Sequence, residues 1–180
     1  MAGRTRTSEA RRLARRRRAA LREAECTGRT AALLVTYPAD VSYLSGFGGD
    51  DSVLLLGRGW SVLVTDGRYA EQAADECPGV ELHVRRQGLA AAVAEALRGR
   101  KVRRLAVQAE HLSIRWRQPL EAHLGSRRIT PADDVIGPLR AVKDDAEVRA
   151  IRRACRIAEE AFGTLTAGGA KALVGRTERE

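Results

Sequence analysis

The sequence predicts an α/β fold with a mixed sheet of roughly six strands and flanking helices. Short apolar runs typical of buried strands alternate along the chain with segments of helical periodicity. The turn sequence Gly57-Arg58-Gly59 separates two of these runs and predicts a β-hairpin. Because a hairpin joins antiparallel strands, the sheet should be mixed rather than wholly parallel.

The expected strands are short and mostly rich in valine and leucine. They cover residues 31–36, 52–57, 61–65, 80–84, 104–108 and 127–130. The expected helices carry apolar residues at helical spacing and end near glycine or proline. They cover residues 8–25, 68–77, 88–99 and 114–124, and one further helical turn opens at Asp133-Asp134.

The N-terminal region is strongly basic. Residues 1–7 are expected to form a disordered basic tail, and Ser8 is the expected N-cap of an amphipathic helix. Arginines surround most of this helix, and its basic face could contact nucleic acid or anionic lipid. A solvated surface is the expected role, so we expect neither a nucleic-acid partner nor a membrane partner.

The expected domain occupies residues 8–136, and a linker follows over residues 137–143. Asp144 then begins a strong helix, and Glu147 completes a capping box with it. The buried face of this helix is marked by Val148, Ile151, Cys155, Ala158 and Phe162. The segment 144–180 contains no obvious partner for this apolar stripe, so the stripe should pack against a neighbour outside this segment.

Bulk composition excludes several classes of protein. The formal net charge is +9, with 29 arginines and 3 lysines, and no apolar run approaches the ~20 residues that span a bilayer. The cysteines at 26, 77 and 155 are widely spaced, which indicates neither a disulfide framework nor a zinc site. Cys77 and Cys155 are expected to be buried and inert, and a cytoplasmic location fits these observations.

The connection over residues 37–51 is the strongest candidate for a functional segment. It lies between two expected strands and is rich in glycine, aromatic residues and carboxylates. Pro38 prevents the first strand from continuing, and the glycines at 46, 48 and 49 allow a positive φ. Alternatively, Tyr43, Leu44 and Phe47 cap the core and the glycines only form turns.

Four motifs occur in order from about residue 13 to residue 180, and together they resemble the creatinase/prolidase/aminopeptidase P group of metallopeptidases. They are Asp40-x-x-Tyr43-Leu44-Ser45-Gly46-Phe47, Thr65-Asp66-Gly67-Arg68-Tyr69, the segment 139–154 and Gly175-Arg176-Thr177-Glu178. The resemblance implies an N-terminal domain of ribonuclease-H-like arrangement, followed by the first helix of a truncated pita-bread catalytic domain. It also implies a homodimer acting on Xaa-Pro peptides.

In this group, two divalent metal ions such as manganese activate a water molecule for attack on the peptide bond. The resemblance places their ligands in the catalytic domain, so we assign no catalytic residue and no metal ligand within these 180 residues. The histidines at 83, 111 and 123 are expected to be structural. The chain alone is therefore expected to be inactive. A non-catalytic module of the same fold that binds a peptide or a partner is the alternative function.

The resemblance implies that the loop from Tyr43 to Asp51 forms one wall of a substrate cleft. Phe47 could contact a proline ring, and Asp50 or Asp51 could bind an ammonium group or an arginine. Arg68 could bind a substrate carboxylate or form a buried pair with Asp40, and we favour the structural pair, whose loss should destabilise the domain. The candidate substrate-binding residues are Tyr43, Phe47, Asp50, Asp51 and Arg68; the candidate structural residues are Asp40, Gly46, Asp66, Tyr69, Arg140 and Lys143.

Overall fold

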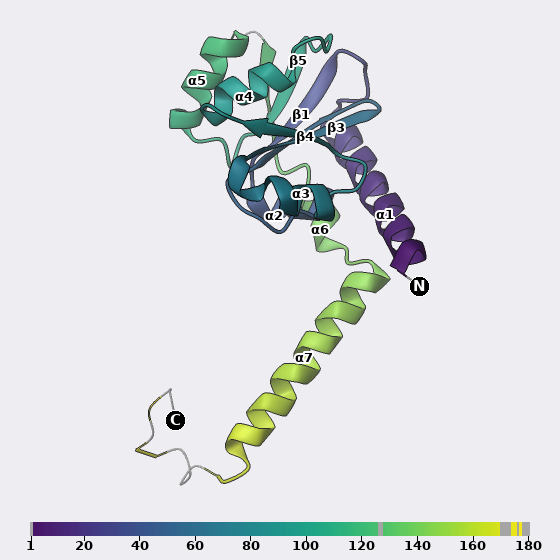
Figure 1. Cartoon of the computed structure of the whole chain (residues 1–180), viewed down its shortest axis with the longest axis vertical. Coiled ribbons are helices and arrows are strands. Elements are labelled where there is room, and N and C mark those ends of the chain that lie inside the picture. The colour runs from purple at the N-terminus through teal and green to yellow at the C-terminus, as the bar shows by residue number, and fades with distance from the viewer. Residues whose placement is uncertain (1, 126–127, 170–173, 176, 178–180) are drawn as a thin grey trace. The chain divides into compact units, whose positions relative to one another are not determined.

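The computed structural model describes residues 2–125, 128–169, 174–175 and 177 (Figure 1). The chain divides into two compact units, Met1–Arg140 and Ala141–Glu180. The first unit contains a central sheet with helices on both of its faces, which confirms the predicted α/β class.

Within the described residues, six strands form one sheet in the order β4-β3-β2-β1-β5-β6. Strand β2 is antiparallel to β1 and β3, and the other neighbouring strands are parallel, so the predicted mixed sheet is confirmed. Gly57 pairs with Trp60 across the predicted hairpin, and Gly59 takes φ 84° in its turn. The strands are β1 (Ala31–Val35), β2 (Val53–Gly57), β3 (Trp60–Asp66), β4 (Glu81–Arg85), β5 (Arg104–Gln108) and β6 (Ile129–Ala132).

Side chains alternate between the two faces of the sheet, and each face has its own buried core. Leu33 and Val35 point into one core, whereas Ala32 and Leu34 point into the other. The first core is covered by α1 (Ala2–Glu23), α2 (Pro38–Ser45) and α3 (Ala70–Glu76), which follows the 3-10 turn η1 (Gly67–Tyr69). The second core is covered by α4 (Leu89–Ala96) and α5 (Ile114–Leu124).

Two expectations about local structure are wrong, and the structure adds a detail to a third. Helix α1 begins at Ala2, so residues 2–7 continue the helix instead of forming a disordered tail. The connection after β1 contains a helix, α2, because Pro38 occupies the first turn of a helix, where a missing N–H costs nothing. The expected linker over residues 137–143 includes the division between the two units, and it contains a short helix, α6 (Gly137–Ala141). The Gly137 N–H donates to the Asp134 carboxylate at 2.9 Å.

Two expectations fall partly on residues that the structure does not describe. The sixth strand begins at Ile129 rather than at 127, and residues 126–127 lie outside the described part. The motif at 175–178 includes residues 176 and 178, which also lie outside it.

The second unit contains one long helix, α7 (Asp145–Thr166). Its capping box is confirmed, because the Asp144 carboxylate accepts from the Ala146 and Glu147 N–H groups and the Glu147 carboxylate accepts from the Asp144 N–H. No residue of α7 is buried, so the expectation of a buried Cys155 is wrong. The expected apolar stripe exists but is exposed, with Ile151 and Phe162 as its largest members.

The other two cysteines are buried in the first unit. Burial raises the pKa of the Cys77 thiol to about 11, and it also raises the pKa of Cys26. Both thiols therefore stay protonated at neutral pH, as expected for inert core cysteines. Among the helices in the described part of the chain, none is both long enough and apolar enough to cross a membrane.

Candidate functional site

Strand direction collects the polar side chains of the first unit at one edge of the sheet. Strands β1, β3, β4 and β5 run in the same direction, so their carboxyl ends lie along one edge, which we call the carboxyl edge. Asp66 ends β3, Arg85 ends β4 and Gln108 ends β5. In sheets of this kind, the carboxyl ends of parallel strands are the usual place for ligand sites.

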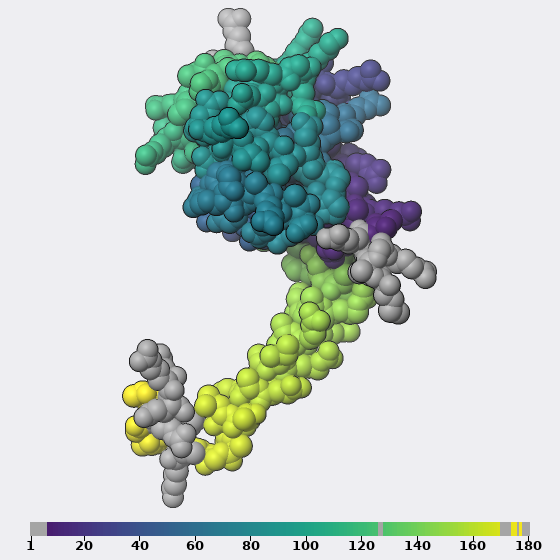
Figure 2. Space-filling view, in the orientation of Figure 1, coloured from purple at the N-terminus to yellow at the C-terminus, as the bar shows by residue number. Residues whose placement is uncertain are grey.

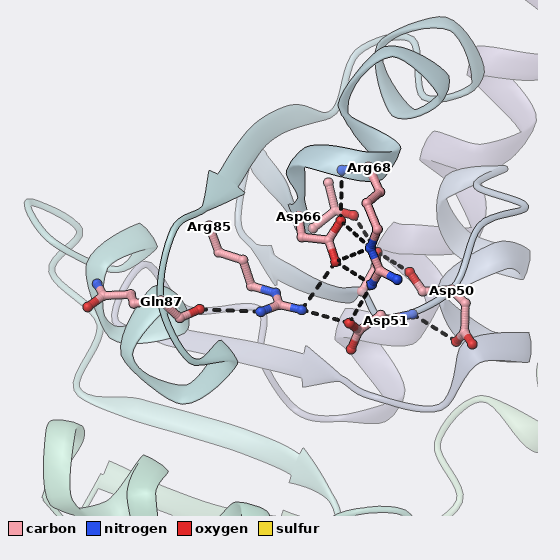
Figure 3. Close-up of polar contacts among 8 residues, drawn as sticks. Asp50, Asp51, Asp66, Arg68, Arg85 and Gln87 are labelled. Carbon is pink, nitrogen blue, oxygen red and sulfur yellow. Dashed lines mark hydrogen bonds and ion pairs between the residues drawn. The ribbon is translucent and has the colours of Figure 1, made fainter.

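Two carboxylates and two guanidinium groups form a charge cluster at this edge (Figure 3). Asp51 Oδ2 accepts hydrogen bonds from Arg85 Nη2 at 2.7 Å and from Arg68 Nη2 at 3.0 Å. Asp66 Oδ2 accepts from Arg68 Nη2 at 2.6 Å and lies 3.4 Å from Arg85 Nη2. The cluster contains two charges of each sign. Its hydrogen bonds connect the loop before β2 to the ends of β3 and β4.

Within the charge cluster, Arg68 affects the pKa of Asp66. Hydrogen bonds from Arg68 lower the pKa of Asp66, so this carboxylate is ionised at neutral pH and donates no proton. Arg68 is the most accessible member, with 68% of its side chain exposed, whereas Arg85 is 19% exposed. Asp51 has φ 53°, a left-handed conformation that is uncommon for residues other than glycine. The loop is thus held in a strained conformation with the Asp51 carboxylate partly accessible.

A second polar network is buried beside the first. Asp40 is only 3% exposed and accepts hydrogen bonds from Gln108 Nε2 at 2.6 Å and Arg140 Nη1 at 3.0 Å. Gln108 Oε1 accepts from the N–H groups of Thr36 and Tyr37, which follow β1. This network joins α2, the end of β5 and α6, so it fixes the shape of the carboxyl edge.

A pocket of about 240 Å³ opens beside these networks. Its walls combine acidic and aromatic side chains, including Asp50, Asp51, His111 and Trp116. Tyr37 stacks on His111 with ring centroids 4.1 Å apart. Thr36 also lines the pocket, and its hydroxyl is buried without a hydrogen-bond partner among the described residues. A ligand with an apolar ring and a polar group would match these walls.

The predicted site residues separate into accessible and structural groups. Asp50 and Asp51 line the pocket, and Arg68 contacts Asp51. Phe47 is 1% exposed and packs at 5.9 Å against the ring of Tyr69, so the expected contact between Phe47 and a proline ring is wrong. The Tyr43 hydroxyl donates to the carbonyl of Leu139 at 2.9 Å, which gives Tyr43 a structural contact.

The expected Arg68–Asp40 pair is also wrong. Arg68 bonds to the aspartates at 51 and 66, while Arg140 pairs with Asp40. Arg140 and Lys143, two of the candidate structural residues, thus have polar contacts: Arg140 donates to the Asp40 carboxylate, and Lys143 Nζ donates to the Ala141 carbonyl at 3.3 Å. Gly46 caps the C-terminus of α2 with φ 85°, a left-handed conformation that favours glycine.

Several residues of the site were not predicted from the sequence, among them Arg85, Gln108 and His111. Each lies at or just after the carboxyl end of a correctly predicted strand. Parallel pairing of those strands was the signal that would have placed them together. Within the described ranges, no group of three or more His, Cys, Asp or Glu side chains could hold a metal ion.

The exposures in the charge cluster lead to a prediction about stability. We expect Arg68→Ala to leave the urea unfolding midpoint nearly unchanged, because its contacts are largely exposed to solvent. Arg85→Ala should lower the free energy of unfolding by about 1.5 kcal/mol, since it removes less exposed charge-assisted hydrogen bonds. Equal losses in the two variants would contradict this assignment. Arg86→Ala, at the exposed neighbour of Arg85, is the control substitution.

Comparison with known proteins identifies the family. The chain matches the creatinase/prolidase N-terminal domain over residues 17–142. Its fold is similar to that of a Xaa-Pro dipeptidase from Bacillus anthracis, with a TM-score of 0.76, 23% identity, and coverage of 88% of this chain and 43% of that chain. The chain therefore belongs to the creatinase/prolidase N-terminal domain family.

Two further relatives show what share of a related protein this chain covers. The N-terminal domain of the cytoplasmic peptidase PepQ from Mycobacterium tuberculosis is 28% identical, with a TM-score of 0.61 over 70% of this chain and 98% of that chain. The uncharacterized peptidase YqhT of Bacillus subtilis is 24% identical over 130 residues, which are 72% of this chain and 37% of that protein. The chain thus spans about two fifths of the longer proteins it resembles.

Proposed function

We propose that this domain forms one wall of the substrate cleft of a metal-dependent Xaa-Pro aminopeptidase or dipeptidase. In this proposal, the two divalent metal ions and all of the catalytic residues belong to a part of the enzyme outside these 180 residues. The carboxyl edge is the proposed wall, and the similarity to Xaa-Pro dipeptidases and a cytoplasmic peptidase supports both the activity and a cytoplasmic location. A homodimer forms part of the proposal, in line with the resemblance.

The accessible carboxylate of Asp51 is the observation that carries this proposal. Asp51 lies on the pocket wall, has a strained backbone, and is held in place by two arginines. A carboxylate fixed in this way loses little freedom when it binds a cationic group of a peptide. The pocket's aromatic walls provide an apolar surface for a small ring, the role first expected of Phe47.

The protein isolated from its source cells tests the proposal. We expect an intact mass about twice the 19.6 kDa of this chain, and proline release from a Xaa-Pro dipeptide that depends on added manganese. In that protein, Asp51→Asn should raise KM roughly tenfold with little change in kcat, the effect of losing one charge-assisted contact in the bound substrate. Asp75→Asn, at an exposed aspartate of α3, is the matched control.

An unchanged KM in the Asp51→Asn variant would contradict the role of the carboxyl edge as a wall of the cleft. An intact mass near 19.6 kDa, without proline release, would favour the alternative function of a non-catalytic module that binds a peptide or a partner.

The isolated 180-residue chain gives a separate prediction. We expect no proline release from a Xaa-Pro dipeptide with added manganese, because the described residues include no group that could hold a metal ion. The measurement is a proline assay with and without a chelator, and the protein from the source cells is the positive control. Chelator-sensitive proline release by the isolated chain would refute the proposed division between the two parts of the enzyme.

A further inference from the structure

Four arginines form a continuous exposed stripe along α1. Arg11, Arg15, Arg18 and Arg22 are all exposed, and their spacing of four, three and four residues places them on one side of the helix. We call this stripe the arginine face. At a rise of about 1.5 Å per residue, it extends for about 16 Å along the helix axis. Figure 2 shows side chains of α1, in purple, projecting from the first unit into solvent.

Other arginines of the same helix have structural contacts, which sets the arginine face apart. Arg12 pairs with Glu9, while Arg16 and Arg17 donate to the carbonyl oxygens of Tyr43 and Leu44 in α2. In the described part of the chain, by contrast, the arginine face makes no side-chain hydrogen bond or ion pair. Its neighbouring members are like charges at helical spacing, an arrangement that destabilises a helix. Packing of α1 onto the domain uses the opposite side, through Leu13 and Ala20.

A groove of about 270 Å³ extends this basic surface toward the sheet. Arg18 belongs to both the arginine face and the groove, whose walls also include Arg17, Trp60 and the backbone of Gly57 and Gly59. Among the described residues, no acidic side chain lines it. Arg58 is exposed in the hairpin turn between those two glycines. The groove lies at the ends of β2 and β3 that face away from the carboxyl edge, so it is separate from the proposed substrate wall.

We propose that the arginine face binds the phosphodiester backbone of a nucleic acid without sequence specificity. Phosphates lie about 3.4 Å apart along the axis of each strand in duplex DNA, so a 16 Å stripe can contact several of them. Guanidinium groups bind phosphate oxygens in a bidentate manner, and the net charge of +9 favours approach to a polyanion.

The composition of α1 favours a nucleic acid over a lipid surface. A helix that binds a membrane inserts large apolar side chains beside its basic residues. Over residues 7–23 of α1, the structure exposes no large apolar side chain. The sequence predicted a solvated surface here. The absence of aromatic residues along α1 argues against nucleic-acid binding by stacking on bases. Backbone recognition needs no stacking on bases, so that argument excludes only a base-reading mode.

Salt-dependent binding to a labelled 20-base-pair DNA duplex tests the proposal. Fluorescence anisotropy with the 180-residue chain should show log K falling with log salt concentration with a slope of about −3.6, from about −0.9 for each of four phosphate contacts. The double variant Arg15→Gln/Arg18→Gln should reduce that slope to about −1.8 and weaken binding at low salt. Its thermal unfolding should stay close to that of the wild-type protein, because among the described residues neither side chain makes a hydrogen bond or an ion pair.

The matched control removes the same charge elsewhere. Arg149→Gln/Arg156→Gln changes two exposed arginines of α7, and we expect it to leave the slope unchanged. Equal weakening in both double variants would show that net charge alone drives binding and would overturn the proposal. It would also be overturned by a wild-type slope in the α1 variant, by no binding at about 50 mM salt, or by binding to phosphatidylserine vesicles but not to the duplex.

Discussion

Asp40→Ala is expected to lower the free energy of unfolding of the chain by about 3 kcal/mol, the lower end of the range for breaking a buried ion pair. Asp40 is 3% exposed and accepts from both Arg140 and Gln108. Its loss leaves the buried amide of Gln108 without this acceptor and removes the carboxylate with which Arg140 pairs. Arg140 keeps 37% of its side chain exposed, so water can solvate part of the released charge, which is why we expect the lower end.

Urea unfolding followed by circular dichroism measures this loss. Asp50→Ala is the matched control, because it removes an exposed carboxylate from the neighbouring loop, and it should change the free energy of unfolding by less than about 0.5 kcal/mol. Gln108→Ala combined with Asp40→Ala should cost less than the sum of the two single variants, since the residues share one hydrogen bond. Strict additivity, or an Asp40→Ala variant as stable as wild type, would contradict the role of the buried network.

Phe47→Ala is expected to cost about 3 to 4 kcal/mol of stability, as is usual for a phenylalanine removed from a packed core. The ring is 1% exposed and belongs to the core beneath α1, α2 and α3. It also lies close under the loop backbone, because a Cβ atom on Gly49 would come within 2.4 Å of its Cζ. Removing the ring would therefore leave a cavity below the loop that carries Asp50 and Asp51.

Thermal and urea unfolding measure this effect, and Phe47→Leu provides the control. Leucine preserves much of the apolar volume, so we expect a loss below about 1.5 kcal/mol. The prediction also distinguishes the two roles considered for this residue. If Phe47 formed a substrate surface, its replacement by alanine would leave the unfolding transition unchanged and affect only KM in the intact enzyme.

Much of the fold could be read from local sequence. The apolar runs predicted the strands within one to two residues, and Gly57-Arg58-Gly59 predicted the hairpin, because both signals depend on residues close in the chain. The capping box at Asp144 and Glu147 is local in the same sense. The failure to predict α2 also concerned a local signal. Pro38 was interpreted as the end of a strand, whereas proline also suits the first turn of a helix.

The candidate site depended instead on contacts between distant residues. Asp40 and Arg140 are 100 positions apart, and Asp51 and Arg85 are 34 positions apart, so no local pattern could pair them. Arg68 was predicted to pair with Asp40, but strand order places it beside Asp51 and Asp66. Burial was decided in the same way, because Phe47 and Cys155 both lie in apolar patterns, yet Phe47 is buried and Cys155 is exposed within the described part of the chain.

Local sequence therefore determined the secondary structure, the family motifs and the basic character of α1, because hydrophobic period, turn residues and charge act over a few neighbouring positions. Only the tertiary structure decided which charges meet, which aromatic rings are buried and which arginines remain exposed. The physical reason is that the parallel direction of β1, β3, β4 and β5 collects side chains from separate parts of the chain at one edge.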